Sequence, residues 1–461
     1  MVSEKTLEEK IKEVLEKKYD ERWEDWIREK DHPSKDGTKP EALDDVVVLD
    51  LSYKSFAGIF CSSILAEWGA EVIRIEPPNG DVARLWTPYG FMHKDTGLAY
   101  LNEGRNKYHI TLNLETREGR EIFRDLAAKV DVIIETFKPG TMDSWGIGYN
   151  DLKEINPGLI YATITAYGQF GSKAKSNMPD YDVTAQAYSG ILSANGEPLD
   201  PSKPAEEQPW AAPTKTGNWM AWYSAGAFTA GAILCALLHR KLTGKGQMLD
   251  CSTAEAYHRL DIGHLIALWE EYGEIHPRTG RLDYTVWLYG FFNCKDRTAF
   301  LGAISIDMWH AFADALGKWD EWGPSVYREI SQLIPWDVQQ KMALEVEKET
   351  RKYTFDELLR KSVEYAKSGR LAPRTFAIGP VQDPKEVLEQ DNWWIRGVFQ
   401  RIRDPLYGEV IIARQAPLMT ETPPRVKWVC RPTGYDNQYV YSKYLSFGPK
   451  KLKELKEKGV I

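Results

Sequence analysis

Residues 45–78 read DVVVLDLSYKSFAGIFCSSILAEWGAEVIRIEPP, and this stretch decides the fold class of the chain. Its first eight residues form an apolar run typical of a central strand in a parallel sheet. A helix-length segment follows at residues 56–69 and closes on a glycine, as helices often do. A second apolar run, residues 70–78, ends at two prolines. Strand, helix and strand in this order predict an α/β domain with a parallel sheet.

The same alternation continues beyond this first unit. Strand patterns recur at residues 109–114, 131–137 and 159–167, with a helical pattern at 116–130. A long helix rich in small residues is predicted from 219 to 240. We divide the chain into an N-terminal helical extension, a first part of the large α/β domain, a long helix with a linker, a small domain and a second part of the large domain. These segments are residues 1–44, 45–220, 221–275, 276–377 and 378–461.

Composition excludes several classes of protein. The chain has 461 residues, of which 43% are hydrophobic and 27% charged, the balance of an ordinary folded protein. A net charge of −8 argues against a nucleic-acid binder, which needs a basic face. Five scattered cysteines without a C-x-x-C pair predict reduced thiols and no zinc site. With no signal-peptide pattern at the N-terminus, we expect a cytoplasmic protein.

The N-terminal extension carries apolar residues at helical spacing. These are Leu7, Ile11, Val14, Leu15, Trp23, Trp26 and Ile27. A stripe of this kind has to pack against something, either the rest of the chain or a partner protein. A second apolar segment, residues 225–238, is too short to span a bilayer and fits a buried helix.

Several well-known catalytic motifs are absent from the sequence. It contains no G-x-G-x-x-G after the first strand, no Walker A motif, no G-x-S-x-G and no H-E-x-x-H. Three loops at predicted strand ends, 75–84, 102–114 and 135–149, carry cations and aromatic residues instead. In open α/β sheets such loops bind ligands. They would suit a ligand with phosphates and a stackable ring, unless these lysines and arginines are simply solvated.

At these loops the chain resembles the class III CoA-transferases, also called the carnitine/bile-acid or formyl-CoA transferase family. The resemblance covers residues 45 to 399 and rests on several stretches in the family's order. They are residues 48–81, 106–114, 131–152, 155–171, 180–190, 237–256 and 378–399. It implies a Rossmann-like large domain built from both chain ends, a smaller inserted domain and two chains interlocked as rings.

The resemblance also implies that coenzyme A lies over the strand-end loops, with no metal required. By motif position, the CoA site should be lined by Ala57, Lys107, Thr136 and Phe137, with Arg74, Arg84, Arg105 and Lys138 as further candidates for its phosphates. The pocket for the acyl group should include Phe56, Tyr181, Trp219 and Trp222.

Family chemistry uses an aspartate as the nucleophile that attacks the thioester, which divides acyl exchange into easier covalent steps. In the family this aspartate opens the long helix before the TG-x-GQ motif. Here residues 213–247 read PTKTGNWMAWYSAGAFTAGAILCALLHRKLTGKGQ and contain no acid. Trp222, or Asn218 if one helical turn is inserted, stands at that place.

Two explanations follow for the missing acid. The chain could be the non-nucleophilic subunit of a hetero-oligomer with a related chain, as in (R)-benzylsuccinate CoA-transferase of anaerobic toluene degradation. It would then move CoA from a donor such as succinyl-CoA to an aromatic or bulky acid. Alternatively, Asp182 in DYDVTAQA could be the nucleophile, although an acid there could simply bind free helix N–H groups.

Two further functions remain open. The family includes acyl-CoA racemases, but these need a histidine upstream of Asp182, and none occurs between His109 and His239. The last alternative is a CoA-binding scaffold without chemistry of its own.

Overall fold

The computed structural model describes Thr6, Glu9, Lys12, Glu13 and residues 39–176, 178–200, 202–368 and 375–461. The apolar stripe predicted at residues 7–27 lies outside the described residues, so its packing stays a prediction. The chain forms two compact units. The first comprises Met1–Leu192, Lys215–Ile275 and Leu388–Ile461, and the second comprises Ser193–Thr214 and His276–Val387.

A six-stranded parallel sheet forms the centre of the first unit, in the order β5-β2-β1-β6-β7-β8. Its strands are β1 (Val47–Leu51), β2 (Glu71–Glu76), β5 (Lys107–Thr111), β6 (Val132–Glu135), β7 (Ile160–Thr165) and β8 (Gln247–Ser252). The predicted α/β class with a parallel sheet is confirmed, and the first apolar run is a central strand. The edge strand β8 was not among the predicted strands, because its side chains alternate between exposed and half-buried.

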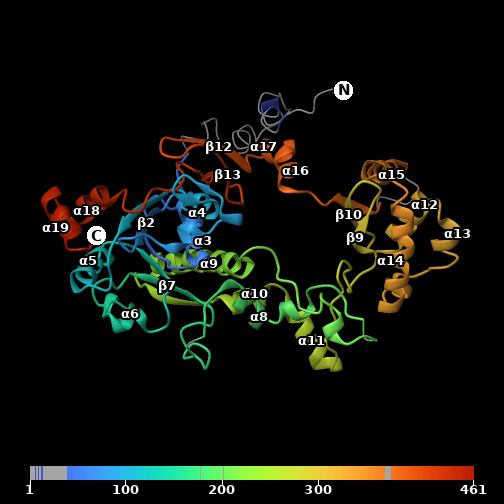
Figure 1. The fold of residues 1–461 in the computed structure, drawn as a ribbon, viewed down its shortest axis with the longest axis horizontal. Helices are drawn as coiled ribbons and strands as arrows, with labels where there is room; N and C mark the ends of the chain where they lie inside the picture. The colour runs from blue at the N-terminus through green and yellow to red at the C-terminus, as the bar shows by residue number, and fades with distance from the viewer. Residues whose placement is uncertain are drawn as a thin grey trace. The chain divides into compact units, whose positions relative to one another are not determined.

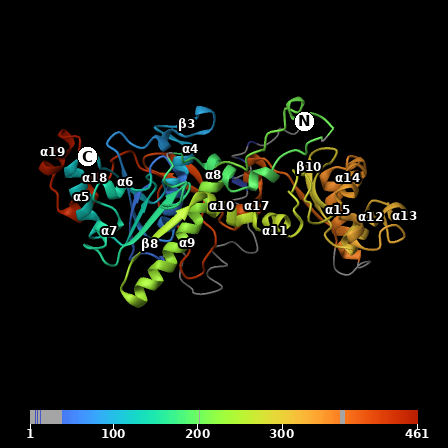
Figure 2. The same cartoon turned by 90° about the horizontal axis from the view of Figure 1, so that it is seen from below.

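Two helices, α3 (Phe56–Glu67) and α9 (Met220–Thr243), cover one face of this sheet (Figure 1). The side chain of Ser55 caps the first turn of α3 by accepting a hydrogen bond from Ala57 N. The two helices approach closely at Gly226, where a Cβ would lie 2.6 Å from the carbonyl oxygen of Ala57. Figure 2 shows α9 alongside β8, at the edge of the sheet.

The opposite face of the sheet is covered by helices from both ends of the chain. They are α5 (Arg117–Ala127), α18 (Asn437–Leu445) and α19 (Pro449–Glu457). The hydroxyl of Tyr441 on α18 donates to the carbonyl of Thr111 at 2.7 Å, which ties the C-terminal helices to β5. These helices cover β5, β2 and β1, and the carboxyl ends of β6 and β7 line a cavity described below.

Within the described residues, α9 is the one helix long and apolar enough to cross a membrane. Length and apolar composition alone do not distinguish such a segment from a core helix. Ala225, Thr229 and Ile233 of α9 are buried, at a spacing of four residues. The prediction of a buried helix is confirmed for one face only, because Phe228, Leu238 and Leu242 of the same helix are exposed.

The first unit is completed by shorter elements around the sheet. They are η2 (Val82–Leu85), η3 (Pro88–Gly90), β3 (Met92–His93), β4 (Thr96–Gly97), α4 (Leu98–Glu103), α6 (Thr141–Ser144), α7 (Tyr149–Leu152), α8 (Asp182–Tyr188), α10 (Thr253–Asp261), α11 (Gly263–Tyr272), α17 (Asp391–Ile395), β12 (Phe399–Asp404) and β13 (Gly408–Ala413). Strands β12 and β13 form an antiparallel hairpin.

The second unit is a three-stranded antiparallel sheet in the order β11-β10-β9, with helices packed on its apolar side chains. Its elements are β9 (Tyr289–Asn293), β10 (Thr298–Gly302), α12 (Ile306–Ala315), α13 (Trp319–Trp322), α14 (Trp336–Thr350), α15 (Phe355–Ser368) and β11 (Ala377–Pro380). Trp287, Trp309 and Phe312 are fully buried in its core. The unit therefore has a hydrophobic core of its own.

Candidate functional site

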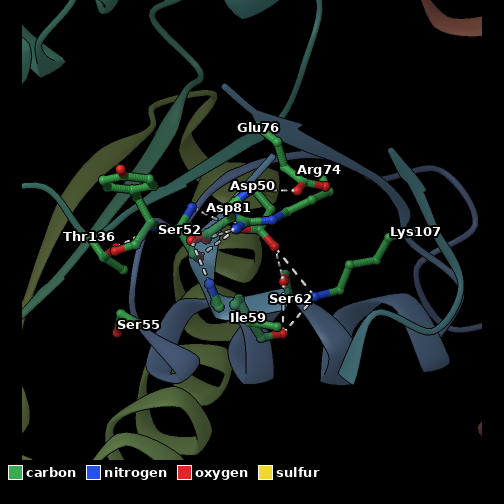
Figure 3. A network of polar contacts seen from close by, with 12 residues as sticks. Asp50, Ser52, Ser55, Ile59, Ser62, Arg74, Glu76, Asp81, Lys107 and Thr136 are labelled. Carbon is green, nitrogen blue, oxygen red and sulfur yellow. Dashed lines mark hydrogen bonds and ion pairs between the residues drawn. The ribbon is translucent and has the colours of Figure 1, made fainter. Parts of the chain in front are cut away.

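A buried ion network lies between the sheet and α3 (Figure 3). Arg74 on β2 bridges Asp50 on β1 at 3.0 Å and Asp81 at 2.6 Å. The Asp50 carboxylate also accepts a hydrogen bond from Ser62 of α3 at 2.6 Å. Lys107 lies 3.4 Å from Asp50 and donates to a backbone carbonyl of α3. The charged groups of this network therefore pair with one another inside the protein, and among them, within the described residues, the Arg74 Nε–H group alone lacks a hydrogen-bond partner.

The charges of this network stabilise one another. Burial by itself would raise the pKa of Asp50, but Arg74 and Lys107 lower it to about 2. Burial also lowers the pKa of Lys107 to about 8, against the opposing effect of Asp50. Removing one member would leave a buried charge without a partner.

Two further arginines that the resemblance assigned to CoA phosphates are paired in the same way. Arg84 binds both carboxylate oxygens of Glu76 at 2.6 Å, and Arg105 lies 2.9 Å from Glu67. His109 also contacts Glu76, at 3.0 Å, and burial lowers the pKa of this histidine to about 4.

These contacts correct one part of the sequence-based interpretation. Arg74, Arg84 and Arg105 were expected to face phosphates and Lys107 to line the CoA site, yet each of these four cations is at most 6% exposed and bound to carboxylates. They hold the sheet, α3 and the following loops together. The sequence does not show this, because Asp50 and Glu67 lie 24 to 57 residues from the cations they pair with, and the nearer pair of Glu76 and Arg84 gives no sign of its burial.

The other predicted CoA residues lie at the carboxyl ends of β1 and β6. Ala57 is buried in α3, and Thr136 bonds the backbone of Tyr53 through its hydroxyl. Phe137 stacks on Tyr53 with ring centroids 6.2 Å apart, and both line a cavity of about 580 Å³ that also contains Trp145. This aromatic cavity offers flat surfaces to a planar ring.

A second, polar cavity of about 660 Å³ opens beside it, and Lys138 lines it. Its floor is formed by Glu135 at the end of β6 and by the side chains of Tyr161, Thr163 and Thr165 on β7. Glu135 and Thr163 are direct neighbours across the two strands. At the rim, Lys173 and Lys175 join Lys138, so that three lysines surround one opening.

This polar cavity was missed by the sequence analysis, although its signal was present. In LIYATITAY, residues 159–167, polar side chains at Tyr161, Thr163 and Thr165 alternate with apolar ones. Alternation along a strand places the two kinds on opposite faces. The apolar set faces α3 and α9, and the polar set faces the cavity.

The predicted acyl pocket is a cluster of four aromatic rings. Phe56 stacks on Trp219 at 4.5 Å, and Trp222 stacks on Trp86 at 5.7 Å with an interplanar angle of 4°. Trp86 was not predicted to belong to this cluster. Trp222 is 3% exposed, whereas Trp86 and Trp219 are half-buried.

Two other predicted residues, Tyr181 and Asn218, do not belong to this aromatic cluster, and Trp219 of the cluster has an unusual backbone conformation. Tyr181 is 55% exposed at the start of α8, and its N–H donates to Thr184. Asn218 is exposed, with its side-chain oxygen 3.3 Å from the amine of Lys215. Trp219, at the N-cap of α9, has the left-handed backbone conformation with φ of 52°.

Asp182 connects α8 to the first turn of α9. One carboxylate oxygen accepts a hydrogen bond from the backbone N–H of Trp222 at 2.9 Å, and the other accepts from the Gln186 amide at 2.7 Å. Burial raises the pKa of Asp182, while the Trp222 N–H group opposes the rise. The carboxylate thus satisfies an otherwise unpaired N–H group at a helix N-terminus.

The described residues contain no group of three or more histidine, cysteine or acidic side chains that could hold a metal ion. All five cysteines are free thiols, and burial raises the pKa of the Cys251 thiol to about 11. A thiol with so high a pKa is a poor nucleophile.

Comparison with known proteins agrees with this architecture. A family model described as CoA-transferase family III matches residues 43–437, which is most of the chain. The chain belongs to CoA-transferase family III. The resemblance seen in the sequence is confirmed, and the chain is an enzyme of the CoA-transferase type. Enzymes of this type use CoA thioesters as substrates.

Several relatives of this family III chain act on succinyl-CoA according to their names. The succinyl-CoA–L-malate CoA-transferase alpha subunit of Chloroflexus aurantiacus is 30% identical over 92% of this chain and 94% of its own length. The beta subunit of the same enzyme is 28% identical over 88% of this chain and 95% of its own length. A CAIB/BAIF family protein from Brucella suis has a similar structure, with a TM-score of 0.72 and 25% identity over 88% of this chain and 99% of its own.

Proposed function

We propose that this chain is one subunit of a CoA-transferase that moves CoA from a small donor, succinyl-CoA, to an organic acid. The family match over residues 43–437 carries this proposal. The names of the alpha and beta subunits from Chloroflexus support it, because they describe a transferase made of two related chains. We expect the partner to be a related chain that interlocks with this one, in the cytoplasm.

In this proposal the partner supplies the nucleophilic aspartate. Two observations support a missing nucleophile in this chain. Residues 213–247 contain no aspartate or glutamate, and neither candidate for the family position is an acid, since Trp222 is a stacked, buried indole and Asn218 an exposed amide. An indole ring cannot form the acyl anhydride that a carboxylate forms.

The proposed CoA site is the pair of cavities at the carboxyl ends of the central strands. Phe137 and Trp145 offer rings to the adenine, and Lys138, Lys173 and Lys175 offer charges to the phosphates. In this assignment the exposed lysines take the role in the CoA site that the sequence analysis gave to the four cations now seen to be buried. It keeps Ala57, Thr136 and Phe137 as residues of the strand ends beneath the ligand.

For the acceptor we propose an aromatic or otherwise bulky acid of the benzylsuccinate type. Trp86 and Trp219 support this choice, since both are half-buried at the edge of the aromatic cluster. Aromatic side chains favour aromatic ligands by stacking and by burying apolar area. Comparing benzylsuccinate with L-malate as acceptor tests the proposal.

The experiment that tests the subunit role uses labelled succinyl-CoA and hydroxylamine, which traps activated acyl groups. The chain alone should trap nothing, and the complex isolated from its own host should form an acyl hydroxamate. Trapping by the chain alone would contradict the proposal and favour Asp182 as the nucleophile. Exchange of an α-proton in heavy water without an acceptor would instead indicate a racemase.

A further inference from the structure

The polar cavity contains an acid whose chemistry the proposed transfer does not use. Glu135 is 4% exposed and ends β6 on the cavity floor. Its Oε2 accepts a hydrogen bond from the backbone N–H of Phe137 at 2.6 Å. Since one oxygen is committed as an acceptor, the other is the place where a proton would face the cavity.

The groups around Glu135 favour the protonated carboxyl. Asp143 on the neighbouring α6 and Asp250 on β8 are acids, and the buried hydroxyl of Tyr161 lies on β7. Burial, with a smaller contribution from the two aspartates, raises the pKa of Glu135 to about 8, against the opposing effect of the Phe137 N–H group. The lysines and Asp180 also line the cavity. Burial likewise raises the pKa of Asp180, to about 6.

A second observation indicates that this floor receives a ligand. Thr165 is 4% exposed, and its hydroxyl has no hydrogen-bond partner within the described part of the chain. The side-chain amide nitrogen of Gln169, which also lines the cavity, is unpartnered in the same sense. Buried polar groups normally have partners, so two unpartnered ones in one cavity point to a bound molecule.

We propose that Glu135 is a ligand-binding residue that meets CoA as a neutral carboxyl group and donates a hydrogen bond to an uncharged acceptor atom, such as a ring nitrogen or an amide carbonyl. This inference rests on the proposed function, because it takes CoA as the ligand of the cavity. The phosphates remain at the lysine rim, away from the acid. The neutral carboxyl of Glu135 would therefore bind an uncharged part of CoA, and the lysines would bind its anionic phosphates.

The test is the affinity for S-methyl-CoA, which has no titrating thiol, measured by calorimetry between pH 6.5 and 9. For the wild type we expect constant affinity up to about pH 8 and then a fall approaching tenfold per pH unit, as for any step that requires one proton. Glu135→Gln keeps a donor and cannot ionise, so its affinity should stay flat over the same range. Glu135→Ala should bind about three- to tenfold more weakly at pH 7.

A matched control is Glu154→Gln, which removes an exposed acid that does not line the cavity. It should follow the wild-type profile. The same pH profile for wild type and Glu135→Gln would overturn the inference while leaving CoA binding intact. Absence of binding at every pH would contradict the proposed function itself, and this inference with it.

The stability of the ligand-free protein gives an independent readout. A carboxyl group whose pKa is higher in the folded state stabilises the fold below its unfolded pKa, and this stabilisation is lost as the pH rises through the folded value of about 8. Glu135→Gln should therefore unfold at a higher temperature than the wild type at pH 9, with a smaller difference at pH 5. An equal difference at both pH values would contradict a neutral Glu135.

Discussion

The two faces of the central sheet both carry charged residues, but they use them differently. On the face covered by α3 and α9, Asp50, Arg74 and Lys107 neutralise one another under a layer of helix. On the opposite face, α5, α18 and α19 cover β5, β2 and β1, but at the carboxyl ends of β6 and β7 Glu135 and the lysine rim line an open cavity, which we call the open face. The charges on the face under α3 and α9, the covered face, therefore maintain the fold, whereas on the open face we propose that the lysines bind a ligand and that Glu135 is neutral.

The contrast limits what can be concluded from the sequence about a cation close to the end of a strand. Arg74 and Lys138 both follow the expected pattern of a cation near the end of a strand. Their positions in the structure differ. Arg74 lies within β2, next to Asp50 of β1, and its side chain is on the face of the sheet that α3 covers. Lys138 follows the end of β6 and is exposed at the cavity.

The largest expected effect comes from breaking the covered face. Arg74→Met removes the partner of both Asp50 and Asp81 and should lower the free energy of unfolding by about 3–5 kcal/mol. Urea denaturation measures this change. Arg117→Met, which removes a solvent-exposed arginine of α5, should have little effect. Equal effects of the two substitutions would contradict the structural role given to the network.

A smaller effect tests the close packing of α9 on α3 behind the same face. In Gly226→Ala the new methyl group would lie 2.6 Å from the Ala57 carbonyl, and such overpacking should cost about 1–3 kcal/mol. Gly231→Ala, on the same helix, has no atom within 4 Å of the new methyl group. It should stabilise the protein by about 0.5–1 kcal/mol, because alanine favours helix. Thermal unfolding of the pair should therefore give shifts of opposite sign.

The smallest effect on stability belongs to the open face. Lys138→Ala and Lys175→Ala should leave the unfolding temperature within about 1 °C of the wild type, because surface changes cost little. Each should weaken CoA binding by about three- to tenfold, more at low salt than at high salt. Lys153→Ala, whose lysine does not line the cavity, is the control. If both rim variants kept the wild-type affinity for CoA, the phosphates would have to bind at another place on the protein.

Much of the first unit follows from local patterns in the sequence. Segments of four to six residues rich in β-branched and apolar side chains give β1, β2, β6 and β7, and a run of small and apolar residues gives α9. β8 was not predicted, because it contains no apolar run. Its exposed residues Met248 and Asp250 alternate with half-buried ones. A strand of this kind is recognised only once β7 provides its partner.

The site was harder to predict, because it depends on distant contacts. The pairing of Arg105 with Glu67 joins residues 38 positions apart, and that of Lys107 with Asp50 joins residues 57 apart, so both follow from the fold and not from one loop alone. Likewise, Asp182 caps a helix that begins about 40 residues later. Trp86 joined the aromatic cluster without any local signal, whereas Trp219 and Trp222 were found from their place in the motif.

The most direct test of the central claim is the intact mass of each subunit after the complex, isolated from its own host, is incubated with succinyl-CoA. If the partner supplies the nucleophile, the mass of this chain stays unchanged and the partner gains a covalent CoA or acyl adduct. A CoA or acyl adduct on this chain, at Asp182 or elsewhere, would contradict the account.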